Sequence, residues 1–268
     1  MRFLISNYST PWFTEPYYFN AGINLIEGAT SNLFDNQRSV YDNFDMSKPD
    51  IFVTHAIQLN WDIVHYLKNN HNIKIAININ NVDDENISKI NDFLKLQTIE
   101  PFFFGAKNSN VNGKFVKVSE AADIFLHSGG DAYRIEKLIF VEKPEDIIPV
   151  DYTCHYTSIK QELANIVDFI LPINGLNSIF KNYDEIVFKG DFFIGSQISF
   201  NAIYSGTKVV FDSKESNSLD KIDDIFKNQK LLSSVKNRHT GLHRLKTLLS
   251  SLQCTELAKK VESELEKL

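Results

Sequence analysis

Cysteine, clustered positive charge and long apolar runs are what this sequence has little of. Two cysteines among 268 residues, Cys154 and Cys254, provide neither a disulfide framework nor a zinc site. The formal net charge is −6 and no cluster of Lys and Arg stands out, so we expect no nucleic-acid partner. No apolar stretch approaches the roughly 20 residues that span a membrane. The start, MRFLISNYSTPWF, does not resemble a signal peptide, so we expect a cytoplasmic location.

The first half of the chain alternates short apolar strands with amphipathic helical stretches. Residues 2–6, 51–54 and 73–79 have the apolar character of buried strands. Apolar residues at helical spacing follow the second and the third of these strands. Such alternation predicts parallel sheets covered by helices on both faces, which is the α/β class.

A turn-rich stretch near the middle of the chain indicates a domain boundary. Lys143-Pro144-Glu145-Asp146 is followed by Pro149, after apolar strands at 122–127 and 138–141. The strand pattern restarts at 150–154. We therefore predict a hinge within residues 142–150.

The length agrees with two small domains, since 268 residues are long for one α/β domain and short for two. We predict two Rossmann-like parallel-sheet halves, residues 1–145 and 146–268, that face a cleft. The tail from about Thr240 has a helical apolar stripe from Leu242 to Leu268. Because that stripe must be buried, we expect a C-terminal helix that packs back across both halves.

Three stretches of the second half carry a family resemblance. They are DYTCHYTSIKQELA (Asp151–Ala164), SQISFNAIYSGTKVVFD (Ser196–Asp212) and RHTGLHRLKTLL (Arg238–Leu249). In this order they resemble the C-terminal half of GT-B glycosyltransferases, particularly the CgeB-like or glycosyltransferase family 1 type group. PDIFVTH and AADIFLHSGGDAY resemble strands of that group's N-terminal domain. The resemblance implies a transferase that moves a sugar from a nucleotide-diphosphate donor, held by the second half, to an acceptor on the first.

The sequence departs from the family at residues that matter for chemistry. In the pattern R-x-F-E-A, the Arg falls on Ile198 and the Glu on Asn201. The resemblance would make that Glu a ligand of the donor ribose and that Arg a partner of its phosphates. Asn can still hydrogen-bond a hydroxyl, without the strength that charge adds, whereas Ile cannot bind a phosphate. A degenerate transferase that binds without turnover is therefore an alternative.

The donor side of the site is predicted from a helix start. A nucleotide diphosphate binds helix N-termini and cations. Gly195, Ser196 and Gln197 open a helix, and Lys189 is the nearest basic residue. A plain capped helix with a solvated lysine explains these residues equally well. The resemblance adds Asn201, His155 and Arg244 as donor-binding candidates.

The acceptor side would supply a base at the strand ends of the first half. Asn7, Glu15, His55, Asp83 and His127 are the candidates, and we assign catalysis to His55 and Asp83. The alternative for both is structural, since each residue is placed to cap the helix that follows it. Polar residues expected to line the cleft are Asn7, Ser128, Gly129 and Gly130.

The leading interpretation is thus a nucleotide-sugar glycosyltransferase with no cofactor and no metal. A catalytically degenerate binding or scaffold protein is the alternative, favoured by Ile198 and Asn201. A periplasmic-type sugar sensor is disfavoured by the start of the chain. The sequence leaves the donor, the acceptor and the stereochemistry open, and it is compatible with a homo-oligomer.

Overall fold

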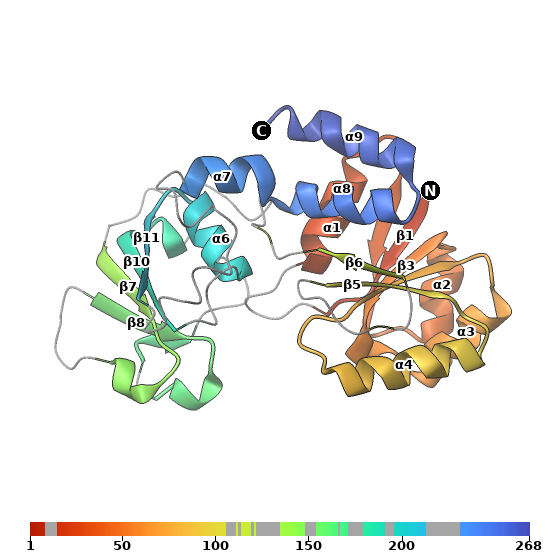
Figure 1. The fold of residues 1–268 in the computed structure, drawn as a ribbon, viewed down its shortest axis with the longest axis horizontal. Coiled ribbons are helices and arrows are strands. Elements are labelled where there is room, and N and C mark those ends of the chain that lie inside the picture. Colours follow the sequence, from red (N-terminus) through yellow and green to blue (C-terminus); the bar gives the residue numbers. More distant parts are fainter. Residues whose placement is uncertain are drawn as a thin grey trace. The chain divides into compact units, whose positions relative to one another are not determined.

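The protein divides into two compact units, each built on a parallel sheet of its own (Figure 1). The structure is a computed structural model. It describes residues 1–8, 15–105, 111, 114–118, 121, 135–147, 154–165, 167–170, 179–190, 196–212 and 231–268. The first unit holds the first sheet together with Leu242–Leu268, and the second holds the second sheet and the chain up to Gly241.

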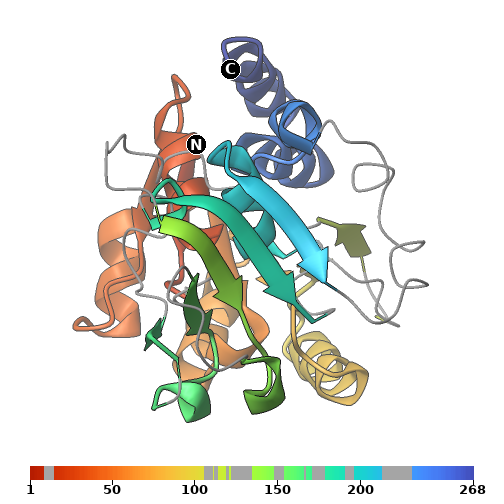
Figure 2. The same ribbon diagram turned by 90° about the vertical axis from the view of Figure 1, so that its left-hand side faces the viewer.

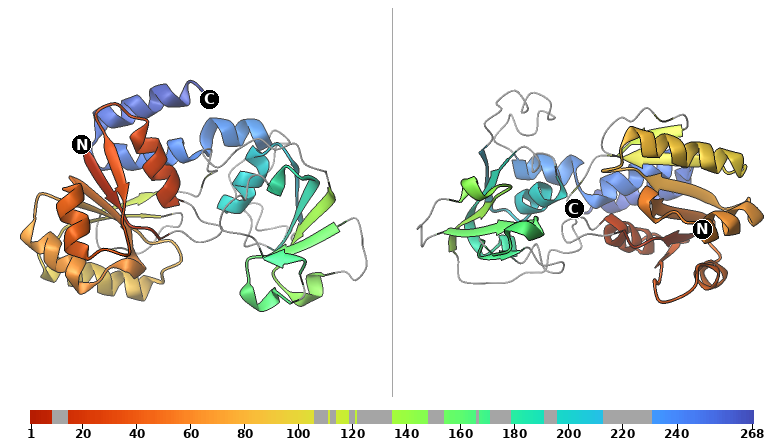
Figure 3. Two further views of the ribbon diagram at one scale, coloured as in Figure 1. Left: turned by 180° about the vertical axis from the view of Figure 1, so that it is seen from behind. Right: turned by 90° about the horizontal axis from the view of Figure 1, so that it is seen from below.

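The first sheet has six described strands in the order β2-β1-β3-β4-β5-β6, all parallel. The strands are β1 (Arg2–Ile5), β2 (Thr30–Leu33), β3 (Ile51–His55), β4 (Lys74–Asn78), β5 (Pro101–Gly105) and β6 (Lys114–Lys117). The helices are α1 (Glu15–Asn24), α2 (Val40–Ser47), η1 (Ala56–Gln58), α3 (Trp61–Asn69) and α4 (Asp84–Leu96). Figures 1 and 3 show α2, α3 and α4 on one face of this sheet and α1 on the other.

Phenylalanine builds much of the core of this unit. Phe44 of α2 packs on Phe52 of β3 with ring centroids 4.9 Å apart, and both side chains are fully buried. Phe103 of β5 belongs to the same cluster, as do Val64 and Leu67 of α3. Strands buried on both faces explain why the sequence shows continuous apolar runs instead of an apolar-polar alternation.

The second sheet has five described strands in the order β11-β10-β7-β8-β9, also parallel. The strands are β7 (Ile135–Phe140), β8 (Cys154–Ser158), β9 (Phe169–Ile170), β10 (Tyr183–Lys189) and β11 (Lys208–Asp212). The helices are η3 (Pro144–Asp146), η4 (Gln161–Leu163), α6 (Gln197–Tyr204) and α7 (Leu231–Arg238). Figure 2 shows β7, β10 and β11 side by side, with their arrows in one direction.

The boundary between the units differs from the hinge expected at 142–150. β7 pairs with both β8 and β10, so this strand belongs to the second sheet and not to a half that ends at residue 145. The stretch with Pro144 forms the short turn η3 within one sheet, between β7 and β8. A turn between two neighbouring strands has the same Pro and polar composition as a linker, which is why the sequence pattern misplaced the boundary. The expected strand at 122–127 lies outside the described residues.

The C-terminal region consists of several helices divided between the units. α7 belongs to the second unit, whereas α8 (Gly241–Ser251) and α9 (Thr255–Leu265) belong almost wholly to the first. The Lys74 Nζ of β4 donates to the Leu252 carbonyl at 3.0 Å, and the Lys260 Nζ of α9 donates to the Glu27 carbonyl at 2.6 Å. α8 and α9 therefore cover the face of the first sheet on which α1 lies (Figure 3).

Candidate functional site

Each sheet has one place where its strand order reverses, and this is where open parallel sheets bind ligands. In the first sheet the chain goes from β1 to β2 on one side and then to β3 on the other, so the reversal lies between β1 and β3. In the second sheet the chain order of the strands, read across the sheet, is third, second, first, fourth, fifth. The reversal there lies between β7 and β10. The carboxyl ends of these four strands are therefore the expected binding edges.

Buried polar side chains gather at the carboxyl edge of the first sheet. Ser6 follows β1 and donates to the Oγ1 of Thr54 on β3 at 2.5 Å. Both residues are buried, with 4% and 0% of their surface exposed. This hydrogen bond satisfies two buried hydroxyl groups that are surrounded by apolar side chains. The pair lies where the strand order reverses, between β1 and β3.

Glu15, the first residue of α1, has a buried carboxylate that is well supplied with donors. Its Oε1 accepts from the hydroxyl of Tyr8 at 2.6 Å and from the Nδ2 of Asn78 at 2.5 Å. Its Oε2 accepts from the hydroxyl of Tyr18 at 3.3 Å. A helix N-terminus also favours a negative charge. Burial, and next the charge of Glu15, raises the pKa of Tyr8 well above its usual value, so Tyr8 stays a neutral donor.

His55, at the end of β3, is placed as a structural residue. Its Nδ1 accepts from the backbone N–H of Ile57 at 3.2 Å, which caps η1. Its Nε2 lies 2.8 Å from the carbonyl of Asn80, so this nitrogen carries the proton. Burial lowers the pKa of His55. Because both ring nitrogens are engaged, the ring can take up a proton only by giving up the cap, which agrees with the structural alternative.

Asp83 is held by a local hydrogen bond, and Asn7 by one to a residue far away in the sequence. Asp83 is the exposed N-cap of α4, and its carboxylate accepts from the Asn86 backbone N–H at 2.8 Å, a bond that lowers its pKa. Asn7 is half-buried beyond β1, and its carbonyl accepts from the Nε2 of Gln58 at 2.8 Å. The capping alternative therefore accounts for Asp83, whereas Asn7 lies at the carboxyl edge, as expected.

A small pocket opens beside this edge. It has a volume of about 180 Å³ and is lined by Ser6, Phe34, Asn36, Gln58, Asn60 and Ile63. Its polar lining consists of one hydroxyl and three amides, with no charged side chain. Hydroxyls and amides both donate and accept, which suits an uncharged ligand rich in hydroxyl groups.

The carboxyl edge of the second sheet carries charged groups. Lys189 ends β10, and its Nζ lies 3.8 Å from the Oδ2 of Asp212 at the end of β11. α6 connects these two strands, so its N-terminus lies at the same edge. The Oγ of its N-cap, Ser196, accepts from the Ser199 N–H at 3.3 Å. Lys189, Ser196 and Gln197 thus lie at one edge of the sheet.

A glutamate and a glycine with positive φ also lie at this edge, and neither was predicted from the sequence. Glu142 follows β7, and Gly190 follows β10 with φ = +113°. A Cβ on Gly190 would lie 2.5 Å from the carboxyl carbon of Glu142, so the two residues are in direct contact. Sequence analysis missed them because residues 138–141 were assigned to the other half, and only the pairing of β7 with β10 brings them together.

The other donor-side candidates are placed differently. His155 lies near the start of β8, away from the carboxyl edge, and its Nδ1 is 2.8 Å from the hydroxyl of Tyr183. Asn201 is fully buried within α6. Arg244 lies on α8 in the first unit. Gly195, Ser128, Gly129, Gly130 and His127 lie outside the described residues.

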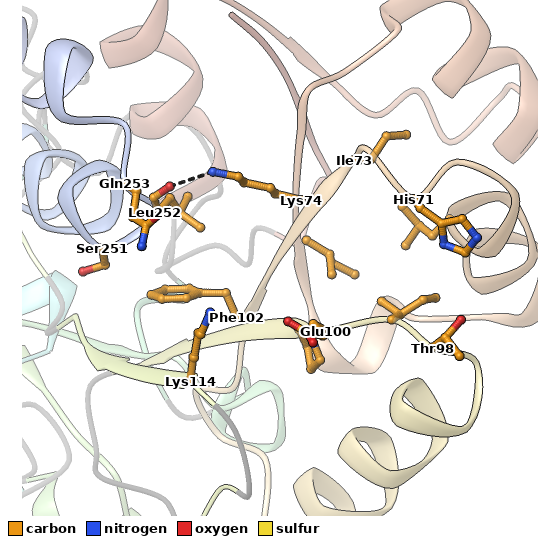
Figure 4. Close-up of a pocket in the computed structure, with 14 residues that line it drawn as sticks. His71, Ile73, Lys74, Thr98, Glu100, Phe102, Lys114, Ser251, Leu252 and Gln253 are labelled. Carbon is orange, nitrogen blue, oxygen red and sulfur yellow. Dashed lines mark hydrogen bonds between the residues drawn. The ribbon is translucent and has the colours of Figure 1, made fainter.

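A larger hollow lies at the opposite, amino edge of the first sheet. Its volume is about 460 Å³, and Figure 4 shows Phe102 between Lys74 and Lys114, with Lys74 pointing toward the turn at Ser251–Gln253. Lys74 is bound to the carbonyl of Leu252 there. The C-terminal turns of α4 and α8 meet at this hollow, and their partial negative charge offsets the lysines. No class of ligand is favoured by that balance.

The described ranges, with their gaps, contain neither a metal-binding cluster nor a membrane-spanning helix. In them, no group of three or more His, Cys, Asp or Glu side chains is arranged to hold a metal ion. In the same ranges, no helix has both the length and the apolar character to cross a membrane. Cys154 and Cys254 are buried and form no disulfide.

Comparison with known proteins gives similarity to solved structures only. No family model and no curated protein matches the chain. The S. aureus MnaA–UDP co-structure is 10% identical over 96% of this chain and 98% of that one, with a TM-score of 0.46. CalG4, the calicheamicin glycosyltransferase, is 8% identical over 100% and 99%, with a TM-score of 0.36. The apo-structure of D-lactate dehydrogenase from Escherichia coli is 12% identical over 88% and 79%, with a TM-score of 0.25. These overlaps are too low to establish a shared fold, so the α/β class rests on the two parallel sheets themselves.

Proposed function

We propose that this chain is a nucleotide-sugar glycosyltransferase that binds its donor at the carboxyl edge of the second sheet. The observation that carries the proposal is the strand order of that sheet, which is the order of dinucleotide-binding Rossmann domains. The resemblance of the second half to CgeB-like transferases supports the same class of donor.

Two groups at this edge suit a diphosphate. The N-terminus of α6 presents backbone amides and the positive end of the helix dipole. Lys189 adds a cation whose side chain is 19% exposed. Its neighbour Asp212 is 61% exposed, so this carboxylate can turn to solvent when a phosphate takes its place. Ile198 and Asn201 stand where the family has Arg and Glu, and we therefore expect micromolar or weaker donor binding.

The pocket at the carboxyl edge of the first sheet suits the acceptor. Its hydroxyl and amide lining matches a neutral molecule with several hydroxyl groups. Transfer in this scheme uses no metal and no organic cofactor.

Lys189→Ala tests the donor site. Isothermal titration with UDP, GDP, dTDP and CMP sugars measures binding to the wild type and to the variant. Loss of a charge-assisted contact to phosphate, roughly 1.5–3 kcal/mol, should weaken binding by about tenfold or more. Lys208→Ala is the matched control, because Lys208 begins β11 at the opposite edge of the same sheet. Equal effects of both substitutions would show that the donor is not held at this edge.

Binding without turnover is the second candidate, and the geometry of His55 favours it. Both ring nitrogens of this candidate base are occupied, and Asp83 is a helix cap. The test incubates the wild type with the nucleotide sugar that it binds. If no sugar is released to water or to added saccharides, with or without EDTA, this candidate is supported. Release that continues in EDTA would support the metal-independent enzyme.

A further inference from the structure

Glu142 and Gly190 form a contact at the reversal of the second sheet that the proposed function does not yet use. Phe140 of β7 pairs with Phe188 of β10, and Glu142 and Gly190 each lie two positions further along their chain segment. A Cβ on Gly190 would lie 2.7 and 2.8 Å from the carboxylate oxygens of Glu142. Only glycine leaves room for this carboxylate, and only glycine readily adopts φ = +113°.

The Oε1 of Glu142 lacks a hydrogen-bond donor. This atom is buried, and no donor reaches it in the part of the chain that the structure describes. Leaving a buried acceptor unsatisfied is unfavourable, and more so when it is charged. Glu15 differs in this respect, because its carboxylate at the start of α1 receives three hydroxyl or amide donors.

The surroundings restrict what could satisfy this oxygen. A carboxylate only accepts, so the missing partner must donate an N–H or O–H. A cationic partner is disfavoured, because Lys189 and the N-terminus of α6 lie at the same edge and favour an anionic ligand. An anionic ligand that also carries O–H donors is a phosphorylated sugar or a nucleotide.

We propose that the carboxylate of Glu142 binds a pair of neighbouring hydroxyls of the ligand, and that Gly190 seats it for this purpose. The proposal rests on the proposed function for the identity of that ligand. The diol is either that of the donor ribose or that of the transferred sugar. Glu142 would then supply the charged acceptor that Asn201 no longer provides.

The first experiment needs no ligand. Glu142→Gln removes the charge from a buried oxygen without a donor, so the unliganded variant should melt about 2–4 °C higher than the wild type. Glu145→Gln is the matched control, since Glu145 is exposed on η3 three residues further on. An unchanged or lower melting temperature for Glu142→Gln, relative to this control, would overturn the proposal.

The second experiment measures binding. The tightest of UDP, GDP and ADP is titrated beside its 2′,3′-dideoxy form, and UDP-glucose beside UDP-2-deoxyglucose. Glu142→Gln should weaken binding of one fully hydroxylated ligand about tenfold and leave its deoxy partner unchanged. The affected pair tells whether the ribose or the transferred sugar is bound. An equal effect on both members of each pair, or none on any, would overturn the proposal.

Failure of the proposed function can be distinguished from failure of this inference. If no nucleotide binds the wild type, the proposed function fails, and methyl β-D-ribofuranoside is used as the probe in thermal shift. Stabilisation of the wild type and not of Glu142→Gln would keep the diol site without the transferase. If neither protein is stabilised, the diol site fails as well.

Discussion

At the scale of single residues, the role of a carboxylate or an imidazole depends on its burial and on its hydrogen-bond partners. Glu15 is a carboxylate with three donors, Glu142 has an oxygen that no donor among the described residues reaches, and Asp83 is an exposed cap. His55 is a buried imidazole whose two nitrogens already have partners. Residue type and position at a strand end made His55 and Asp83 candidates for catalysis, whereas hydrogen bonding gives each a structural role.

His55 should make the stability of the first unit depend on pH. Its folded pKa is lowered by burial, so the neutral ring contributes stability that is fully present above the unfolded pKa of about 6.5. As pH falls below that value the unfolded chain binds the proton first, and stability falls by up to about 1.4 kcal/mol per pH unit. His55→Asn keeps an acceptor for the η1 cap and cannot titrate. In urea unfolding at pH 7, 6 and 5, this variant should lose less stability toward pH 5 than the wild type.

The exposed His71 provides the comparison for that measurement. His71→Asn makes the same substitution at a histidine of the same unit that lies on the surface. If His55→Asn and His71→Asn give the same curve, burial of His55 is not a source of the pH dependence.

At the scale of elements, α4 and α8 end in the same way. The Ile99 N–H donates to the Leu94 carbonyl and the Thr98 N–H to that of Lys95, which is the Schellman arrangement. Cys254 and Gln253 make the equivalent bonds to Leu249 and Ser250 at the end of α8. The left-handed position is held by Thr98 at φ = 59° and by Gln253 at φ = 61°, where glycine is usual.

Thr98→Gly should therefore stabilise the protein. A β-branched residue in the left-handed region is strained, and glycine removes a penalty of roughly 1 kcal/mol. Thr98→Ala is the control, because it deletes the hydroxyl and the methyl group but keeps the Cβ that causes the strain. Chemical denaturation should show a gain for the glycine variant and little or none for alanine. A loss for glycine would mean that backbone freedom in the unfolded chain outweighs the strain.

At the scale of the whole molecule, the first unit is assembled from both ends of the chain. Leu245, Leu249 and Val261 of α8 and α9 are buried, each contributing roughly 1.5–3 kcal/mol. Their sum is comparable to the free energy of unfolding of a typical protein, which is roughly 5–15 kcal/mol. A chain of residues 1–241 should therefore no longer show cooperative unfolding of its first unit. Thermal unfolding monitored by circular dichroism measures this. Removal of only 266–268, which are exposed, should leave it intact. Cooperative melting of both shortened chains would show that α8 and α9 are dispensable.

The sequence predicted the class of the fold and several strands, because apolar runs such as residues 51–54 lie in fully buried strands. The hinge at 142–150 was wrong, since Pro144 marks a turn inside a sheet. Ser196, Gln197 and Lys189 were found as a strand end and a helix start that follow one another in the chain. Glu142 and Gly190 meet only through the strand order, which no local pattern contains. The assignment of any of these residues to a donor site stays a prediction.

The return of the last helices to the first sheet also affects how the protein is made. Ribosomes add about 5–20 residues per second, and roughly 150 residues follow the first sheet before the chain reaches Leu268. For roughly 7–30 seconds, then, each nascent chain carries a parallel sheet on which α1 is present but α8 and α9 are still missing from the same face. Chaperones that shield such surfaces during translation should matter more for this protein than for one whose domains close in the order of synthesis.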